Sequence, residues 1–134
     1  QVGLIVRLPL ASGLLSGKYS KETKFAEQDH RNYNRDGQAF NVGETFAGLP
    51  FEQGVEFADA LKPLVPEGMT MAQMALRWIL DHPAVSVVIP GASSPGQVDA
   101  NVSAAALPPL PAELHAQLAD LYRSSVRDAI RGPY

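Results

Sequence analysis

The stretch with the clearest chemical potential is a small polar turn directly after an apolar run. It reads IPGASSPGQVDAN, from Ile89 to Asn101, and contains no lysine or arginine. Gly91 allows close backbone approach, Ser93 and Ser94 offer hydroxyl donors, and a helix can begin at Pro95. Free backbone N–H groups at a helix start favour an anion. The pattern therefore predicts a phosphate-binding turn that works through its backbone.

Two amide side chains follow this turn. Gln97 and Asn101 lie four residues apart, so a helix places them on one face. There both could hydrogen-bond a flat polar group such as a purine edge. The pattern also fits a well-capped turn with solvated amides, and the sequence leaves both interpretations open.

A second loop, PLASGLLSGK, offers Ser12, Gly13, Ser16 and Gly17 before Lys18. It is not a Walker motif, because Tyr19 stands where serine or threonine must follow the lysine. The loop indicates at most a weak anion site. A plain turn from strand to helix is an equal alternative.

Acid–base and metal chemistry have little support in this sequence. The histidines His30, His82 and His115 are scattered, and their positions favour surface or capping roles. No metal-ligand spacing occurs, so we expect no metal site. We interpret one dense polar cluster as a solvated loop: Asp29, His30, Tyr33 and Asp36.

Composition narrows the class of protein. The chain has 134 residues, a formal charge of −3 and no cysteine. Its pI of about 5.5 offers no basic footprint for nucleic acid. No run is long enough to span a membrane, so we expect a soluble, cytoplasmic protein. The first residue is Gln1, which suggests a fragment of a longer chain.

These motifs need elements to position them. Residues 2–10 and 84–90 are apolar and β-branched, and predict two strands buried on both faces. Helices are expected over 51–66, 70–83, 94–105 and 111–130, and residues 21–49 form a long, glycine-punctuated loop excursion. In the second of these helices, Met71, Met74 and Trp78 have helical spacing, which predicts a buried face; Met69 precedes it.

Alternating strands and helices indicate an α/β chain with a parallel sheet. Two parallel strands cannot close a sheet, and each keeps an unpaired edge. Both polar loops follow the carboxyl ends of strands, so they should lie at the same end of the sheet. In α/β barrels the face at that end carries the active site.

Three segments together are similar to the C-terminal part of the aldo-keto reductases, especially the bacterial and channel-subunit-like branch. They read VRLPLASGLLSGKYS, MAQMALRWILDHPAVSVVIPGASSPGQVDANVSA and LPPLPAELHAQLADL, in the family's order and spacing. The resemblance implies the last two strands and about five helices of a TIM (β/α)8 barrel, incomplete on its own. It also implies reduction of aldehydes or ketones with NADP(H), or less often NAD(H).

The resemblance assigns a role to each matching residue. The pyrophosphate and nicotinamide-ribose path would be lined by Pro9, Leu10, Ala11 and Ser12. The loop over the pyrophosphate would be shaped by Gly13, Leu15, Gly17 and Lys18. The adenosine ribose and its 2′-phosphate would be held by Gly91, Ala92 and Ser93, and the adenine would be contacted by Gln97 and Asn101. Arg7 stands where many members stack an aromatic ring on the nicotinamide, and a planar guanidinium can also stack.

Departures from the family pattern limit these assignments. Ser93 and Ser94 replace a common lysine or arginine near the 2′-phosphate, which leaves the choice of NADP or NAD open. Gly96 and Ala100 replace common acidic residues. The family's catalytic tetrad would precede Gln1, so no residue here is expected to be catalytic, and the chain alone should be inactive.

Three hypotheses follow. In the first, the chain is part of an NADP(H)-dependent oxidoreductase and supplies most of the cofactor site. Its partners are then a small carbonyl substrate and the upstream half-barrel, or a second chain that covers the strand edges. In the second, it is a non-catalytic nucleotide-binding or protein-interaction half-barrel module. In the third, it is a helical remnant. Nucleotide titration separates the third from the others.

Overall fold

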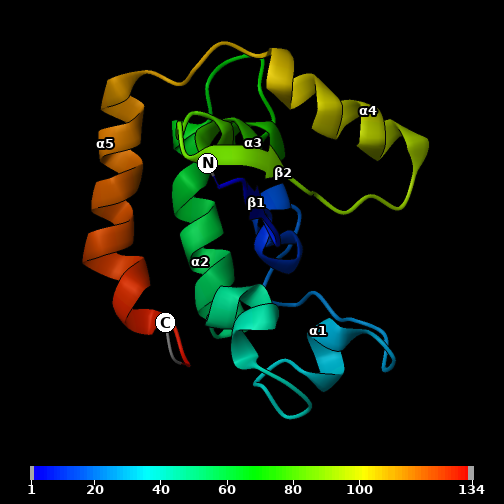
Figure 1. Ribbon diagram of the computed structural model, residues 1–134. Helices are drawn as coiled ribbons and strands as arrows, with labels where there is room; N and C mark the ends of the chain where they lie inside the picture. Colours follow the sequence, from blue (N-terminus) through cyan, green and yellow to red (C-terminus); the bar gives the residue numbers. More distant parts are fainter. Residues whose placement is uncertain (1, 133–134) are drawn as a thin grey trace.

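A computed structural model describes residues 2–132 (Figure 1). The α-helices and strands follow the order β1 (Leu4–Val6), α1 (His30–Tyr33), α2 (Phe51–Leu61), α3 (Met71–Leu80), β2 (Val85–Val88), α4 (Pro95–Ser103) and α5 (Ala112–Leu121). Short 3-10 turns lie at Ala11–Ser16, Val42–Glu44, Phe46–Gly48, Lys62–Leu64, Ala104–Ala106 and Arg127–Ala129. The expected last helix therefore ends at Leu121 and continues as a π-helical turn, Tyr122–Val126.

The two strands pair in parallel, as predicted. Leu4 aligns with Val85 and Val6 with Val88, with an irregularity just after Leu4. At that irregularity the Leu4 N–H donates to the Ser86 hydroxyl at 3.1 Å. The parallel pairing places both carboxyl ends at one edge, where the two polar loops begin.

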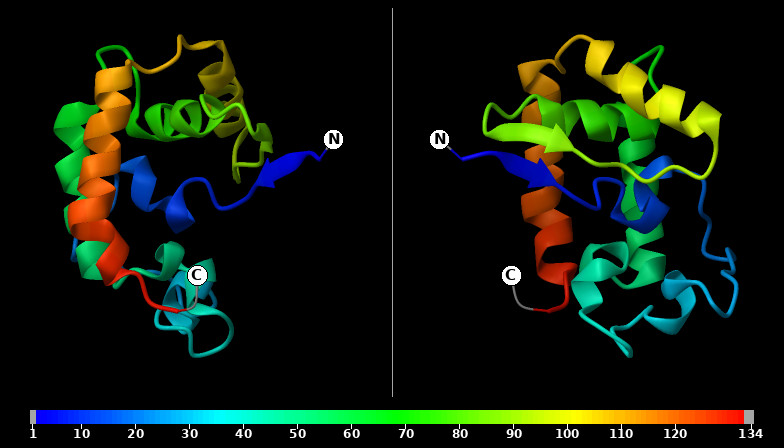
Figure 2. Two further views of the ribbon diagram at one scale, coloured as in Figure 1. Left: turned by 60° about the vertical axis from the view of Figure 1, so that its left-hand side comes forward. Right: turned by 45° about the vertical axis from the view of Figure 1, so that its right-hand side comes forward.

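The expectation of strands buried on both faces is wrong within the described chain. Ile5 is 62% exposed and Val87 is 46% exposed. Helices α2, α3 and α5 lie to one side of the strands, which form the outermost layer on the other (Figure 2). One layer of helices can cover only one face of a two-stranded sheet. An apolar run therefore predicts that a strand can be buried on both faces, but it does not show what covers the strand in this chain.

Helix α3 begins with a side-chain cap and has one buried face. The Thr70 hydroxyl accepts from the Gln73 N–H, and the Gln73 side chain accepts from the Thr70 N–H, which makes a capping box. Met71 and Met74 are buried against Leu110 and the start of α5. The burial predicted for Trp78 is wrong, because this ring lies beside the rings of His82 and His115, outside the buried cluster, and is 37% exposed.

Residues of the excursion take part in the apolar core beside helix α2. Leu14 packs there with Phe51 and Val55 of α2, and with Phe46 and Leu49 of residues 21–49. Phe46 is fully buried, and so are the polar side chains of Asn34 and Thr45. The Asn34 amide donates to the Thr45 hydroxyl at 3.0 Å, so this polar pair is satisfied inside the core. Residues 21–49 are thus a packed part of the domain.

Candidate functional site

The ends of the two strands are joined just before the polar loops begin. The Ile89 N–H donates to the Val6 carbonyl at 3.0 Å, one residue beyond β2. The chain segments that follow the two strands therefore leave the sheet at the same end (Figure 2). The structure therefore brings together the two loops that the sequence singled out.

The loop after β2 is exposed from residue 91 onward, and so is the first part of α4. Ser94 caps the helix by accepting from the Gln97 N–H, with Pro95 in the first turn. The Gln97 amide oxygen accepts from the Ser93 N–H at 2.6 Å and from the Ser93 hydroxyl at 3.1 Å. The Asn101 amide donates to the Gly91 carbonyl at 3.2 Å. Both amides share one face, as expected, and brace the turn.

This turn keeps donors for an anion. The N–H groups of Ser94 and Gly96 have no acceptor among residues 2–132. A Cβ added at Gly91 would meet nothing within 4 Å, so the backbone can be approached closely there. The turn itself, residues 89–94, contains no lysine or arginine. The geometry fits a phosphate bound through the backbone at a helix start.

The loop after β1 has a different character, because its backbone is unusual. Leu8, Ala11 and Ser12 have positive φ values of 54°, 47° and 57° although none is glycine. Gly13 has a φ of 96°, and a Cβ there would collide with the Tyr19 ring. Such conformations cost free energy and persist only where surrounding contacts hold them.

The contacts that hold this loop come from the excursion. The Ser12 hydroxyl donates to the Glu44 carbonyl at 3.3 Å and accepts from the Phe46 N–H at 3.1 Å. The Arg7 guanidinium makes a bidentate ion pair with the Glu44 carboxylate, with Nη1 to Oε1 at 3.0 Å and Nη2 to Oε2 at 2.7 Å. Glu44 was not expected at this edge. It lies 37 residues from Arg7 in the chain, and no local pattern marks it.

The remaining predicted residues lie along the same loop. Pro9, Leu10 and Leu15 are half-buried, whereas Lys18 is exposed and its N–H donates to the Ser16 hydroxyl. Gly17 ends the turn with a left-handed conformation, φ 70°. Ala92 lies on the exposed loop after β2. The predicted set therefore falls on two adjoining loops and on helix α4.

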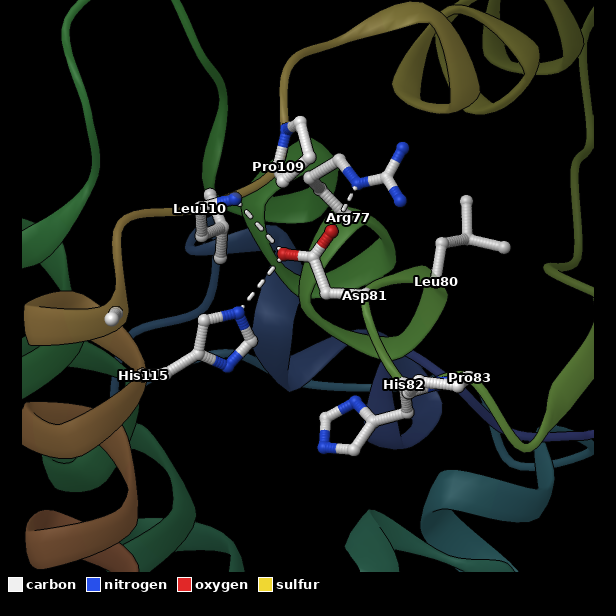
Figure 3. Close-up of a pocket in the computed structure, with 9 residues that line it drawn as sticks. Arg77, Leu80, Asp81, His82, Pro83, Pro109, Leu110 and His115 are labelled. Atoms are coloured by element: carbon white, nitrogen blue, oxygen red, sulfur yellow. Dashed lines mark hydrogen bonds and ion pairs between the residues drawn. The ribbon is translucent and has the colours of Figure 1, made fainter.

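A second polar cluster, away from these loops, surrounds Asp81 (Figure 3). Its carboxylate accepts from Arg77 Nε and the Leu110 N–H, and pairs with His115 Nε2, each at 2.9 Å. Burial acts to raise the pKa of Asp81, but these hydrogen bonds outweigh it and lower the pKa. No local pattern marks Asp81, whose partners come from α3 and from residues 110–115. The shallow depression beside Asp81 has a volume of about 580 Å³ and lies between the end of α3 and the start of α5.

His82 and Asp29 have structural roles. The His82 ring bonds the Trp78 carbonyl at 2.8 Å, which confirms the capping role expected for it. The solvated-cluster interpretation is wrong for Asp29, which caps α1 and pairs with Arg31. That hydrogen bond lowers the pKa of Asp29 to about 2, against a smaller opposing effect of burial. Within residues 2–132, no group of three or more acidic, histidine or cysteine side chains could hold a metal.

Comparison with known proteins agrees with this geometry. The model of the aldo/keto reductase family matches residues 1–123. A probable voltage-gated potassium channel subunit beta of Arabidopsis thaliana is 34% identical over 115 residues, which cover 81% of this chain and 31% of the relative. L-glyceraldehyde 3-phosphate reductase of Escherichia coli K12 is 35% identical over 104 residues, which cover 77% of this chain and 28% of the relative.

The fold also has a solved counterpart. The glycerol dehydrogenase of Gluconobacter oxydans aligns with a TM-score of 0.72 and 26% identity, over 98% of this chain and 37% of that structure. The chain thus spans about a third of the proteins it matches. No helix within residues 2–132 is long and apolar enough to cross a membrane. Sequence, sheet and comparisons agree that this chain belongs to the aldo/keto reductase family and has the fold of the C-terminal part of its TIM barrel.

Proposed function

We propose that this chain supplies most of the cofactor site of an NADP(H)-dependent oxidoreductase that reduces aldehydes or ketones. The observation that carries the proposal is the joint origin of the two loops, tied at the strand ends by the Ile89 to Val6 hydrogen bond. One loop presents backbone donors at a helix start, and the other holds an unusual backbone conformation. Together they form an edge suited to an extended, anionic nucleotide.

The two loops would divide the nucleotide between them. Gly91 to Ser93 would hold the adenosine ribose and its phosphate, and Gln97 and Asn101 would contact adenine. The Gln97 oxygen already accepts two bonds from Ser93, so its amide NH2 is the group left for a base. The loop from Pro9 to Lys18 would follow the pyrophosphate, and Arg7 would lie at the nicotinamide end.

The reduced nicotinamide, when bound, supplies the hydride that converts the carbonyl to an alcohol. The acid that protonates the carbonyl oxygen would come from outside this chain. A general acid must lie within hydrogen-bond reach of that oxygen, and none of the residues along the proposed path is assigned this role. The role of these residues is therefore to bind and orient.

Titration of the full-length protein with NADPH and NADH, followed by nucleotide fluorescence, tests this proposal. Gly91→Leu adds a side chain where the anion would approach, and we expect at least about tenfold weaker NADPH binding. Ala116→Leu adds an exposed leucine on α5 and serves as the matched control. Equal affinity of the parent and Gly91→Leu proteins would contradict the assignment.

The size of the change with each nucleotide also tests the cofactor. A Ser93→Ala variant that weakens NADPH binding more than NADH binding would indicate that Ser93 contacts the 2′-phosphate. Nucleotide binding by the full-length protein without turnover of any aldehyde would favour the non-catalytic module. The relative named as a channel subunit makes that alternative worth measuring.

A further inference from the structure

The Arg7–Glu44 ion pair is unusual in how firmly one partner is held. Glu44 is the last residue of the 3-10 turn Val42–Glu44. Asn41 caps this turn, and its side chain accepts from the Gly43 N–H at 2.7 Å. The Glu44 N–H donates to the Asn41 carbonyl, and the next residue, Thr45, is fully buried. The carboxylate therefore projects from an anchored backbone.

Arg7 has no comparable support. Its side chain is 66% exposed, against 34% for that of Glu44. Among residues 2–132, the guanidinium makes hydrogen bonds to Glu44 alone. Two parallel N–H to oxygen bonds fix the plane of a guanidinium as well as its position. Glu44 thus decides where the planar cation lies at the end of β1.

We propose that Glu44 is a positioning and charge-balancing residue for the nicotinamide end of the cofactor site, acting through Arg7. The inference rests on the proposed function, because it requires the nicotinamide to lie beside Arg7. The pair as a whole is neutral, so it presents an oriented guanidinium plane without a net positive charge. The excursion, through Glu44, then takes part in the site.

The physical consequence concerns the two redox states of the cofactor. The oxidised nicotinamide ring carries a positive charge and the reduced ring is neutral, whereas the rest of the molecule is the same. An uncompensated Arg7 repels the oxidised ring, and an uncompensated Glu44 attracts it. The ratio of the dissociation constants of NADP⁺ and NADPH therefore reports the net charge of the pair, because contributions from the phosphates cancel.

Three variants of the full-length protein test this proposal. Glu44→Gln should raise the ratio of the NADP⁺ to the NADPH dissociation constant about three- to tenfold, since Arg7 is then unbalanced. Arg7→Gln should lower that ratio, since the carboxylate is then unbalanced. The double variant should return towards the parent ratio. A purely structural role would move both single variants in the same direction.

The controls separate the possible failures. Glu56→Gln breaks the exposed Lys21–Glu56 pair on α2 and should leave the ratio unchanged. Melting temperatures identify any variant that fails to fold, and the two variants of opposite sign keep the test decisive if one is lost. If the parent protein binds neither nucleotide, the proposed function fails. If it binds both and the ratio moves in neither single variant, or moves the same way in both, only the role of Glu44 fails.

Discussion

The two polar loops leave the same sheet edge but are supported in different ways. The loop after β1 is held by the excursion, through the Ser12 hydrogen bonds, the Arg7–Glu44 pair and a core that includes Phe46. The loop after β2 and the first turns of α4 are exposed from residue 91 to residue 100, and among residues 2–132 the side-chain bonds that brace this loop come from Gln97 and Asn101 of α4.

This difference shows two routes to an ordered binding loop. A loop with a costly backbone needs tertiary contacts that exceed the cost, and the excursion provides them. A loop at a helix start needs little support, because capping bonds and the helix itself orient its donors. Changes in the core should therefore damage the first loop far more than the second.

Phe46→Ala should have the largest effect. Phe46 is fully buried among Leu14, Leu49 and Phe51, so its loss leaves a cavity, and we expect the free energy of unfolding to fall by about 3–5 kcal/mol. Val102→Ala, at a residue 67% exposed on α4, should change it by no more than about 0.5 kcal/mol. Urea unfolding of both variants makes the measurement, and similar values would contradict the contrast between the regions.

Acidification should weaken the excursion next. Asp29 has a folded-state pKa lowered to about 2, so the stability it contributes is present above about pH 4 and is lost as pH falls towards 2. The pKa shift corresponds to about 2 kcal/mol. Asp29→Asn should flatten the loss of unfolding free energy over this interval, measured by urea unfolding at a series of pH values. Parallel curves for parent and variant would argue against the Asp29–Arg31 pair.

The smallest expected effect compares one glycine from each loop. Gly13→Ala places a side chain at φ 96° and against the Tyr19 ring, and should cost about 1–2 kcal/mol of stability. Gly91→Ala meets open space at an ordinary φ and should cost less than about 0.5 kcal/mol. Thermal unfolding of the two variants suffices. Equal losses would mean that the second loop is as constrained as the first.

Local patterns predicted much of the fold. The parallel strands, the capped helix α3 and the turn at Ser94 and Pro95 follow from β-branched runs and capping residues that act over a few positions. The exposure of Trp78 could not be predicted in this way, because helical spacing identifies a stripe but not which side chains cover each of its positions, and Trp78 lies beside His82 and His115. The packing of Phe46 was missed for a related reason, since its partners come from three separate segments.

The sequence by itself determined which residues could form an anion-binding turn, and in what order strands and helices would follow. Those properties depend on side-chain type and short-range hydrogen bonding. The tertiary structure was needed to show that Glu44 meets Arg7 and that the Ser12 hydroxyl bonds the backbone of Glu44 and Phe46. Hydrogen bonds and ion pairs between distant residues depend on how the backbone is placed in space, and spacing along the chain does not specify that placement.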